Sequence, residues 1–150
     1  TAQMDFSLPE RFNLDFINNE GEKEKPVVIH RAMLGSIERF IGILLEHTGG
    51  DLPFWLAPNQ INIIPISDKH LEYSKKVQNI LLEKKYRVSI DDSNERLGQK
   101  IRNSELKKIP TMLIIGDKEM ESNTLSVRTR KLGDLGTLSQ KEFIEKLITL

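Results

Sequence analysis

Two residues near the start of the chain are of types that bind metal ions and phosphates. His30 and Arg39 lie in the stretch VVIHRAMLGSIERF, residues 27–40. An imidazole binds zinc when two or three further ligands complete the site, and a guanidinium binds phosphate through its fork of N–H donors. The other histidines, His47 and His70, fall in separate predicted elements. Local spacing therefore favours a hydrogen-bonded core histidine and an arginine packed along its helix over a metal ligand and a phosphate ligand.

Basic residues gather in the second half of the chain, on one predicted helix and at one strand end. They are Arg96, Lys100, Arg102, Lys107 and Lys108 on the helix, and Arg128, Arg130 and Lys131 at the strand end. If these two segments lie close together, they form a basic surface that holds phosphates. The alternative is an ordinary solvated face, and charge alone does not separate the two.

Two polar residues follow predicted strands in the same region. Asn94 and Glu119 stand at strand exits, the edge where open α/β sheets bind ligands. An amide pairs with a base edge, and a carboxylate accepts from the adjacent imino and amino groups of guanine. The alternative for Glu119 is a plain turn residue. No Gly-x-Gly-x-x-Gly or Walker-type loop is present, so any contact with ATP uses another architecture.

The elements that must position these residues fall into two parts. In the first, strands are predicted over 1–7 and 12–17, a turn around Gly21, a strand in PVVIH and an amphipathic helix over 36–47 with Ser36 as N-cap. The Gly- and Pro-rich stretch GGDLPFWLAP, which begins at residue 49, predicts a domain boundary near residue 50.

The second part alternates strands and helices. Strands are predicted at 61–67, 86–91, 111–116 and 124–130, and helices at 68–85 (capped by Asp68), 95–108 and 139–149. DKEMESN is predicted as a turn. The order predicts an α/β fold with a mixed, mostly parallel sheet flanked by helices.

The composition of the chain excludes several classes of protein. The 150 residues hold 22 Lys plus Arg, 22 Asp plus Glu and no Cys, so disulfide frameworks and thiolate zinc sites made by this chain alone are excluded. No apolar run approaches the length of a membrane span, and TAQMDFSLPERF lacks the pattern of a signal peptide. The first residue is not Met and falls within a predicted strand, so we expect the chain to be cut from a longer protein.

The stretch PVVIHRAMLGSIERFIGILLEH resembles the third signature motif of class II aminoacyl-tRNA synthetases, in the form found in threonyl-tRNA synthetases. TAQMDFSLPERF is similar to the strand that precedes that motif. Four later blocks resemble the anticodon-binding domain of the same family: FWLAPNQINIIPIS, YRVSIDDSNERLGQKIR, IPTMLIIGDKEMES and SVRTRKLGDLG. The resemblance implies residues 1–50 as the strand-and-helix end of an antiparallel class II catalytic core and residues 51–150 as an anticodon-binding α/β domain.

The resemblance also implies roles for particular residues. His30 matches a zinc ligand, Arg39 an ATP contact, and Gln3 and Ser36 the pocket for threonyl-adenylate. The residues that match readers of the anticodon are Asn94, Arg102, Glu119 and Arg128. The implied cofactors and substrates are zinc, ATP with magnesium, threonine and tRNA(Thr), in a homodimeric cytoplasmic enzyme that has no membrane partner.

The family's first two motifs and its other zinc ligands, a cysteine and a histidine, are absent from this sequence, as is an editing domain. We therefore expect the chain to be part of a threonine–tRNA ligase that is inactive alone. The alternatives are a non-catalytic anticodon-type RNA-binding module or accessory subunit, and a sister synthetase for proline, histidine or glycine. A pure RNA reader needs neither His30 nor Arg39, and a histidine directly before Arg-Ala-x-Leu-Gly-Ser fits the threonine enzyme.

Overall fold

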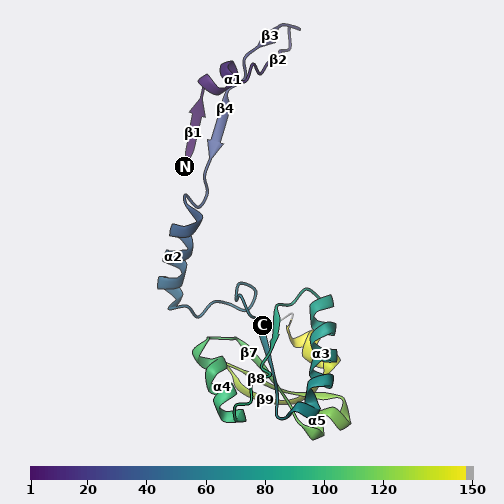
Figure 1. The fold of residues 1–150 in the computed structure, drawn as a ribbon. Coiled ribbons are helices and arrows are strands. Elements are labelled where there is room, and N and C mark those ends of the chain that lie inside the picture. Colours follow the sequence, from purple (N-terminus) through teal and green to yellow (C-terminus); the bar gives the residue numbers. More distant parts are fainter. Residues whose placement is uncertain (148–150) are drawn as a thin grey trace. The chain divides into compact units, whose positions relative to one another are not determined.

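The computed structural model describes residues 1–147 in two units, Thr1–Gly49 and Gly50–Leu150, with residues 148–150 outside the description (Figure 1). The first unit is built on an antiparallel ribbon of two strands, β1 (Ala2–Asp5) and β4 (Val28–Arg31). Between them come α1 (Ser7–Arg11) and a hairpin of β2 (Phe16–Ile17) and β3 (Lys23–Glu24). Strand β1 ends before Leu8 and Pro9, which lie inside α1.

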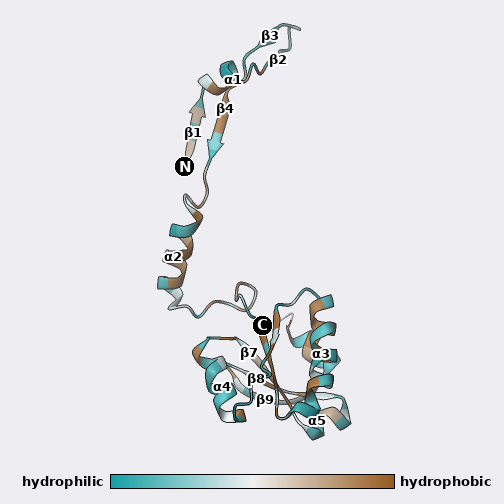
Figure 2. Ribbon diagram, in the orientation of Figure 1, coloured by the Kyte–Doolittle hydropathy of each residue, from teal (hydrophilic) through white to brown (hydrophobic). Residues whose placement is uncertain are grey.

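Helix α2 (Ile37–Thr48) completes the first unit and has the ends expected from its sequence. Ser36 Oγ accepts a hydrogen bond from the backbone N–H of Arg39, and Gly49 takes a left-handed conformation with φ 57°. Both features satisfy backbone groups that a helix end leaves unpaired. The apolar stripe of α2, visible as brown ribbon in Figure 2, is not buried within residues 1–147, since no residue of this helix falls in the buried class.

The second unit is a five-stranded sheet in the order β6-β5-β7-β8-β9. Its strands are β5 (Ile61–Pro65), β6 (Val88–Ile90), β7 (Thr111–Ile115), β8 (Thr124–Thr129) and β9 (Gly133–Ser139). Strand β5 pairs with β6 and β7 in parallel, whereas the β7–β8 and β8–β9 pairs are antiparallel. The predicted mixed α/β sheet is confirmed, but the expectation that it is mostly parallel is wrong, because its parallel and antiparallel strand pairs are equal in number.

Helices cover both faces of this sheet. They are η1 (Asp68–His70), α3 (Leu71–Glu83), α4 (Leu97–Leu106), α5 (Asp117–Ser122) and α6 (Gln140–Leu147). The α3 and α6 side chains Val77, Leu81 and Phe143 form the main core with Ile63 and Leu113 of the sheet. Helix α4 contacts the opposite face, where Asn62 bonds Ser104. Because both faces are covered, β5 is buried at every residue, which explains its continuous apolar sequence.

Four local predictions are wrong or lie outside the description. Ser67, not Asp68, precedes the helical segment that includes α3, and that segment opens with the 3₁₀ turn η1. The stretch DKEMESN holds the helix α5 instead of a turn. Strand β9 was not expected, because its sequence is rich in glycine, with Gly133 and Gly136 at positive φ. The predicted inward position of Ile148 lies outside the described residues.

Candidate functional site

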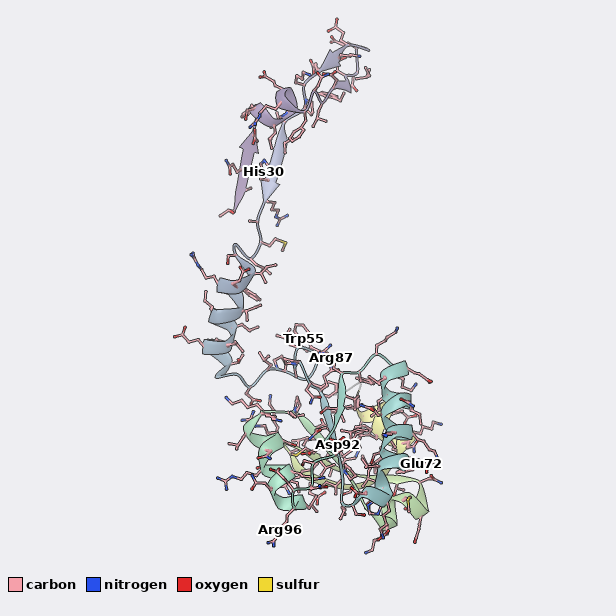
Figure 3. All side chains as sticks on the ribbon, in the orientation of Figure 1. His30, Trp55, Glu72, Arg87, Asp92 and Arg96 are labelled. Atoms are coloured by element: carbon pink, nitrogen blue, oxygen red, sulfur yellow. The ribbon has the colours of Figure 1, made fainter. Side chains whose placement is uncertain are left out.

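The ribbon of the first unit brings Gln3 and His30 together. They lie directly opposite each other on β1 and β4, so their side chains share one face of the ribbon. The His30 side chain, labelled in Figure 3, is 46% exposed, and its Nε2 lies 3.3 Å from Oδ2 of Asp5. The core-histidine interpretation is therefore wrong: His30 is an accessible side chain oriented by a carboxylate.

Asp5 is the residue of this site that the sequence reasoning missed. Its Oδ1 accepts from the backbone N–H groups of Ser7 and Leu8 and from the Ser7 hydroxyl, each at 2.9 Å. The Leu8 N–H, then the Ser7 hydroxyl, lower the pKa of Asp5 to about 2. The available signal was a carboxylate two residues before Ser7, the first residue of α1, since Asp commonly accepts from the first N–H groups of a helix. Asp5 thus links the start of α1 to His30.

The residues around His30 do not form a complete zinc site. Zinc takes three or four protein ligands, or three ligands plus water. Among residues 1–147, no group of three or more His, Cys, Asp or Glu side chains is placed to hold a metal ion. His30 and Asp5 supply two donors, and one of the Asp5 oxygens is already occupied by α1.

Ser36 and Arg39 meet at the start of α2. The Ser36 hydroxyl donates to Oε2 of Glu38 at 2.8 Å and accepts from the Arg39 N–H at 3.2 Å. The backbone N–H of Glu38 and then this hydroxyl lower the pKa of the Glu38 carboxyl. The Arg39 side chain is exposed, and no hydrogen bond or ion pair of its guanidinium is found within the described chain. Arg39 is therefore available to an anion.

In the second unit, Asn94 and Glu119 lie on segments that leave the same edge of the sheet. Strands β6, β5 and β7 are parallel, so their carboxyl ends meet at one edge, with Asn94 after β6 and Glu119 after β7. Glu119 Oε2 accepts from the Gly116 N–H at 3.0 Å. A Cβ at Gly116 would lie 3.1 Å from Glu119 Oε2 and 2.8 Å from Cδ1 of Ile66, the end of a half-exposed side chain. The other oxygen of Glu119 has no hydrogen bond partner in the part of the chain described.

Arg102 and Arg128 lie on the α4 side of the sheet. Arg128 Nη2 is 3.5 Å from Oε1 of Glu105, with both side chains more than a third exposed. Arg102 and Glu105 line the same open depression. Arg128 pairs with Met112 near the amino end of β7, whereas Glu119 follows the carboxyl end of that strand. The structure therefore places Arg102 and Arg128 on the α4 side of the sheet, and Asn94 and Glu119 on segments that leave its carboxyl edge.

The basic helix and the basic strand end lie close together, as the contact between Arg128 and Glu105 shows. Two members are not free for phosphate. Lys100 is 5% exposed and donates to backbone carbonyls, so its assignment to a basic surface is wrong. Arg130 Nη1 is held by Oδ1 of Asp51 at 2.7 Å. Arg96, which projects at the start of α4 in Figure 3, remains exposed together with Arg102, Lys107 and Lys131.

A cavity of about 410 Å³ opens beside the Asn94 loop, between β6 and α4. Its lining includes Asp91, Asp92, Glu95 and Lys107. This volume lies within the range of small-molecule pockets. Within residues 1–147, no helix is both long and apolar enough to cross a membrane.

Comparison with known proteins places both units in families. Residues 60–150 match the family model of the anticodon binding domain, and residues 1–48 match that of the tRNA synthetase class II core domain (G, H, P, S and T). The chain is 54% identical over 148 residues, 99% of its length, to a threonine–tRNA ligase of Caldanaerobacter subterraneus. It is 53% identical over 98% of its length to the threonine–tRNA ligase of Clostridium tetani. The chain spans 23% of each of these relatives.

Solved structures agree with these matches. The RNA binding domain of threonyl-tRNA synthetase from Cryptosporidium parvum superposes with a TM-score of 0.84 at 40% identity, over 99% of this chain and 38% of that one. A prolyl-tRNA synthetase from the same organism, at 22% identity and TM-score 0.65, shares the fold; the match covers 99% of this chain and 32% of that one. The chain therefore belongs to the anticodon-binding domain family, and a segment of the class II tRNA synthetase core precedes that domain.

Proposed function

We propose that this chain is the anticodon-reading part and one active-site wall of a threonine–tRNA ligase, an enzyme that activates threonine with ATP and transfers it to tRNA(Thr). The observation that carries the proposal is similarity to threonine–tRNA ligases over nearly the whole chain, with core and anticodon models matched in order. We propose residue 50 as the boundary between the core segment and the anticodon-binding domain, in a cytoplasmic, homodimeric parent enzyme.

On the wall, Gln3, His30, Ser36 and Arg39 face the substrates. The exposed guanidinium of Arg39 would oppose the negative charge that develops on phosphate during adenylation. Ser36 orders the first turn of α2, which carries Arg39. His30, held by Asp5, would be one zinc ligand of the complete enzyme, whose other ligands lie outside this sequence. When bound, zinc supplies a Lewis acid that distinguishes the threonine hydroxyl from a methyl group.

In the anticodon-binding domain, each reader has groups suited to a base edge. The free oxygen of Glu119 accepts from the imino and amino groups of guanine, the middle base of threonine anticodons. Asn94 offers an amide donor and acceptor to a neighbouring base. Arg102 and Arg128 lie toward the α4 face, where their guanidinium groups contact bases or phosphates that continue along the strand.

Binding of a short RNA hairpin with a threonine anticodon tests this proposal. Fluorescence anisotropy with the 150-residue chain gives the Kd for the hairpin and for one with inosine replacing the middle guanine. Glu119→Gln presents an amide donor to the donors of guanine, so we expect roughly 30-fold weaker binding, from a loss of about 2 kcal/mol. The variant should also discriminate less against inosine, which lacks the amino group.

Lys107→Ala is the matched control, because it removes an exposed positive charge from the same surface. We expect an effect of about threefold that disappears at high salt, as for a single screened phosphate contact. Equal losses for Glu119→Gln, Arg128→Ala and Lys107→Ala would contradict specific reading and indicate attraction by charge alone.

A further inference from the structure

Two buried titratable side chains at the carboxyl edge of the sheet have no part in the contacts proposed above. His70, in the turn after β5, is 1% exposed, and Lys100, in α4, is 5% exposed. A buried polar group is retained where its hydrogen bonds are satisfied, and each of these side chains is bonded to backbone or carboxylate groups. Lys100 bonds Pro65, the last residue of β5, and His70 bonds Ser67, two residues beyond that strand.

Lys100 joins the ends of two strands. Its Nζ donates to the carbonyl oxygen of Pro65 at 3.3 Å and to that of Asp91 at 3.0 Å. Asp91 begins the loop that contains Asn94, and its Oδ1 accepts from the N–H and hydroxyl of Ser93. The ammonium group of Lys100 therefore determines where the Asn94 loop leaves β6 relative to β5.

His70 makes the corresponding link to the other loop. The Ser67 N–H donates to Nδ1 at 3.2 Å, so Nδ1 is the acceptor and Nε2–H donates to Oδ1 of Asp117 at 3.1 Å. Asp117 is the first residue of α5, two positions before Glu119. Hydrogen bonds from Lys69 and then His70 lower the pKa of the Asp117 carboxyl, which keeps it ionised as an acceptor. The imidazole thus ties the exit of β5 to the helix that carries Glu119.

We propose that His70 and Lys100 are positioning residues for anticodon recognition: His70 sets the place of Glu119 through Asp117, and Lys100 sets the place of Asn94 through Asp91. Neither touches RNA. The inference rests on the proposed function, because it requires Glu119 and Asn94 to read bases. It predicts that His70 is coupled energetically to Glu119, and that Lys100 is coupled separately to Asn94.

Double-mutant cycles on hairpin binding by the 150-residue chain test these couplings. We expect His70→Ala to weaken binding roughly three- to tenfold, the loss of about one hydrogen bond. In a Glu119→Gln background it should change the Kd less than twofold, yet keep its full effect in an Asn94→Ala background. Lys100→Met should show the reverse: little effect with Asn94→Ala and full effect with Glu119→Gln.

Matched variants separate positioning from general damage. His70→Gln keeps a donor in place of Nε2–H and should restore most of the binding. Lys69→Ala removes an exposed partner of Asp117 and should change the Kd less than about twofold. Lys107→Met removes an exposed lysine that lies close to Lys100 in the sequence, and it should weaken binding by no more than about threefold in every background, with no coupling to Glu119 or Asn94. If His70→Ala does not fold, Asp117→Ala breaks the same link from its exposed end and should couple to Glu119 in the same way.

The outcomes for this inference and for the proposed function differ. Multiplicative losses in every background, or no restoration by a folded His70→Gln variant, would overturn the positioning roles while leaving anticodon reading intact. Failure of Glu119→Gln and Asn94→Ala by themselves to weaken binding would refute the proposed function. Both the positioning roles and the proposed function are supported if His70→Ala weakens hairpin binding only while Glu119 is intact and Lys100→Met only while Asn94 is intact.

Discussion

A series of hydrogen bonds links side chains of β5, β6 and α4 below the Asn94 loop. The group at its end, a backbone carbonyl, fixes which partner donates in each bond. The carbonyl oxygen of Lys100 only accepts, so the Ser104 hydroxyl donates to it at 2.9 Å. Asn62 Nδ2 therefore donates to Ser104 Oγ at 2.8 Å, and Asn62 Oδ1 accepts from Ser89 at 2.7 Å. Asn59 Nδ2 donates to Ser89 in turn. Each donor depends on the next group in the series.

Ser104→Ala removes the link at its most buried point. Ser104 is 2% exposed and Asn62 is 6% exposed, so water cannot readily replace the hydroxyl. The variant leaves the Nδ2 donor of Asn62 buried without its partner, which costs about 1–3 kcal/mol. We expect the free energy of unfolding to fall by about 2 kcal/mol. Asn62→Val combined with Ser104→Ala removes both partners, so the double variant should lose at least about 1 kcal/mol less than the sum of the singles.

Urea unfolding followed by far-UV circular dichroism measures these changes, with the midpoint shifting while the slope stays constant. Ser122→Ala is the matched control, because Ser122 also donates to the carbonyl four residues earlier, Lys118 O at 2.6 Å, but on the surface. It should stay within about 0.5 kcal/mol. A Ser104→Ala loss as small as that of the control, or strict additivity with Asn62→Val, would refute the reasoning.

Three further predictions concern the two units separately. The Asp5 carboxyl should titrate near pH 2 by NMR, and Ser7→Ala should raise that pKa by removing a hydrogen bond to the ionised form. Because folding lowers this pKa from 3.8, the contribution of Asp5 to stability is present above about pH 4 and lost as the pH falls toward 2; a titration midpoint near 4 would contradict it. The 150-residue chain should catalyse no ATP–pyrophosphate exchange and retain no zinc after dialysis, and exchange above background would show that the wall is active by itself. Gly116→Ala should weaken hairpin binding by roughly threefold, because the added Cβ would lie 3.1 Å from Glu119 Oε2 and shift the carboxylate that the Gly116 N–H holds, whereas the half-exposed Ile66 side chain can move aside; unchanged affinity would refute that dependence.

Local sequence signals predicted the elements whose stability is decided by near neighbours. The N-cap Ser36 and the left-handed Gly49 bound α2 as expected, because capping depends on residues within one turn. The apolar runs of β5 and β7 predicted strands covered on both faces. The same signals predicted that Asn94 and Glu119 follow parallel strands, since connection rules place consecutive crossovers on one sheet edge.

Predictions from local residue spacing were wrong or missing where a residue's partner lies far along the chain. Strand β9 forms because β8 presents an edge to which even a glycine-rich segment can pair. Lys100 looked like a surface cation, but its position under the ends of β5 and β6 places it in the interior. His30 looked like a core residue, but its ribbon leaves it exposed beside Asp5, 25 residues earlier.

The sequence by itself determined the class of fold, the family and the identity of the candidate contacts, since these depend on residue types in order. Only the tertiary structure decided how the four anticodon candidates divide between the carboxyl edge and the α4 face. It also decided that two buried side chains, His70 and Lys100, bond to groups at the strand exits. The physical reason is that burial and hydrogen-bond partnership are set by strand register and helix packing, which join residues separated by tens of positions in the chain.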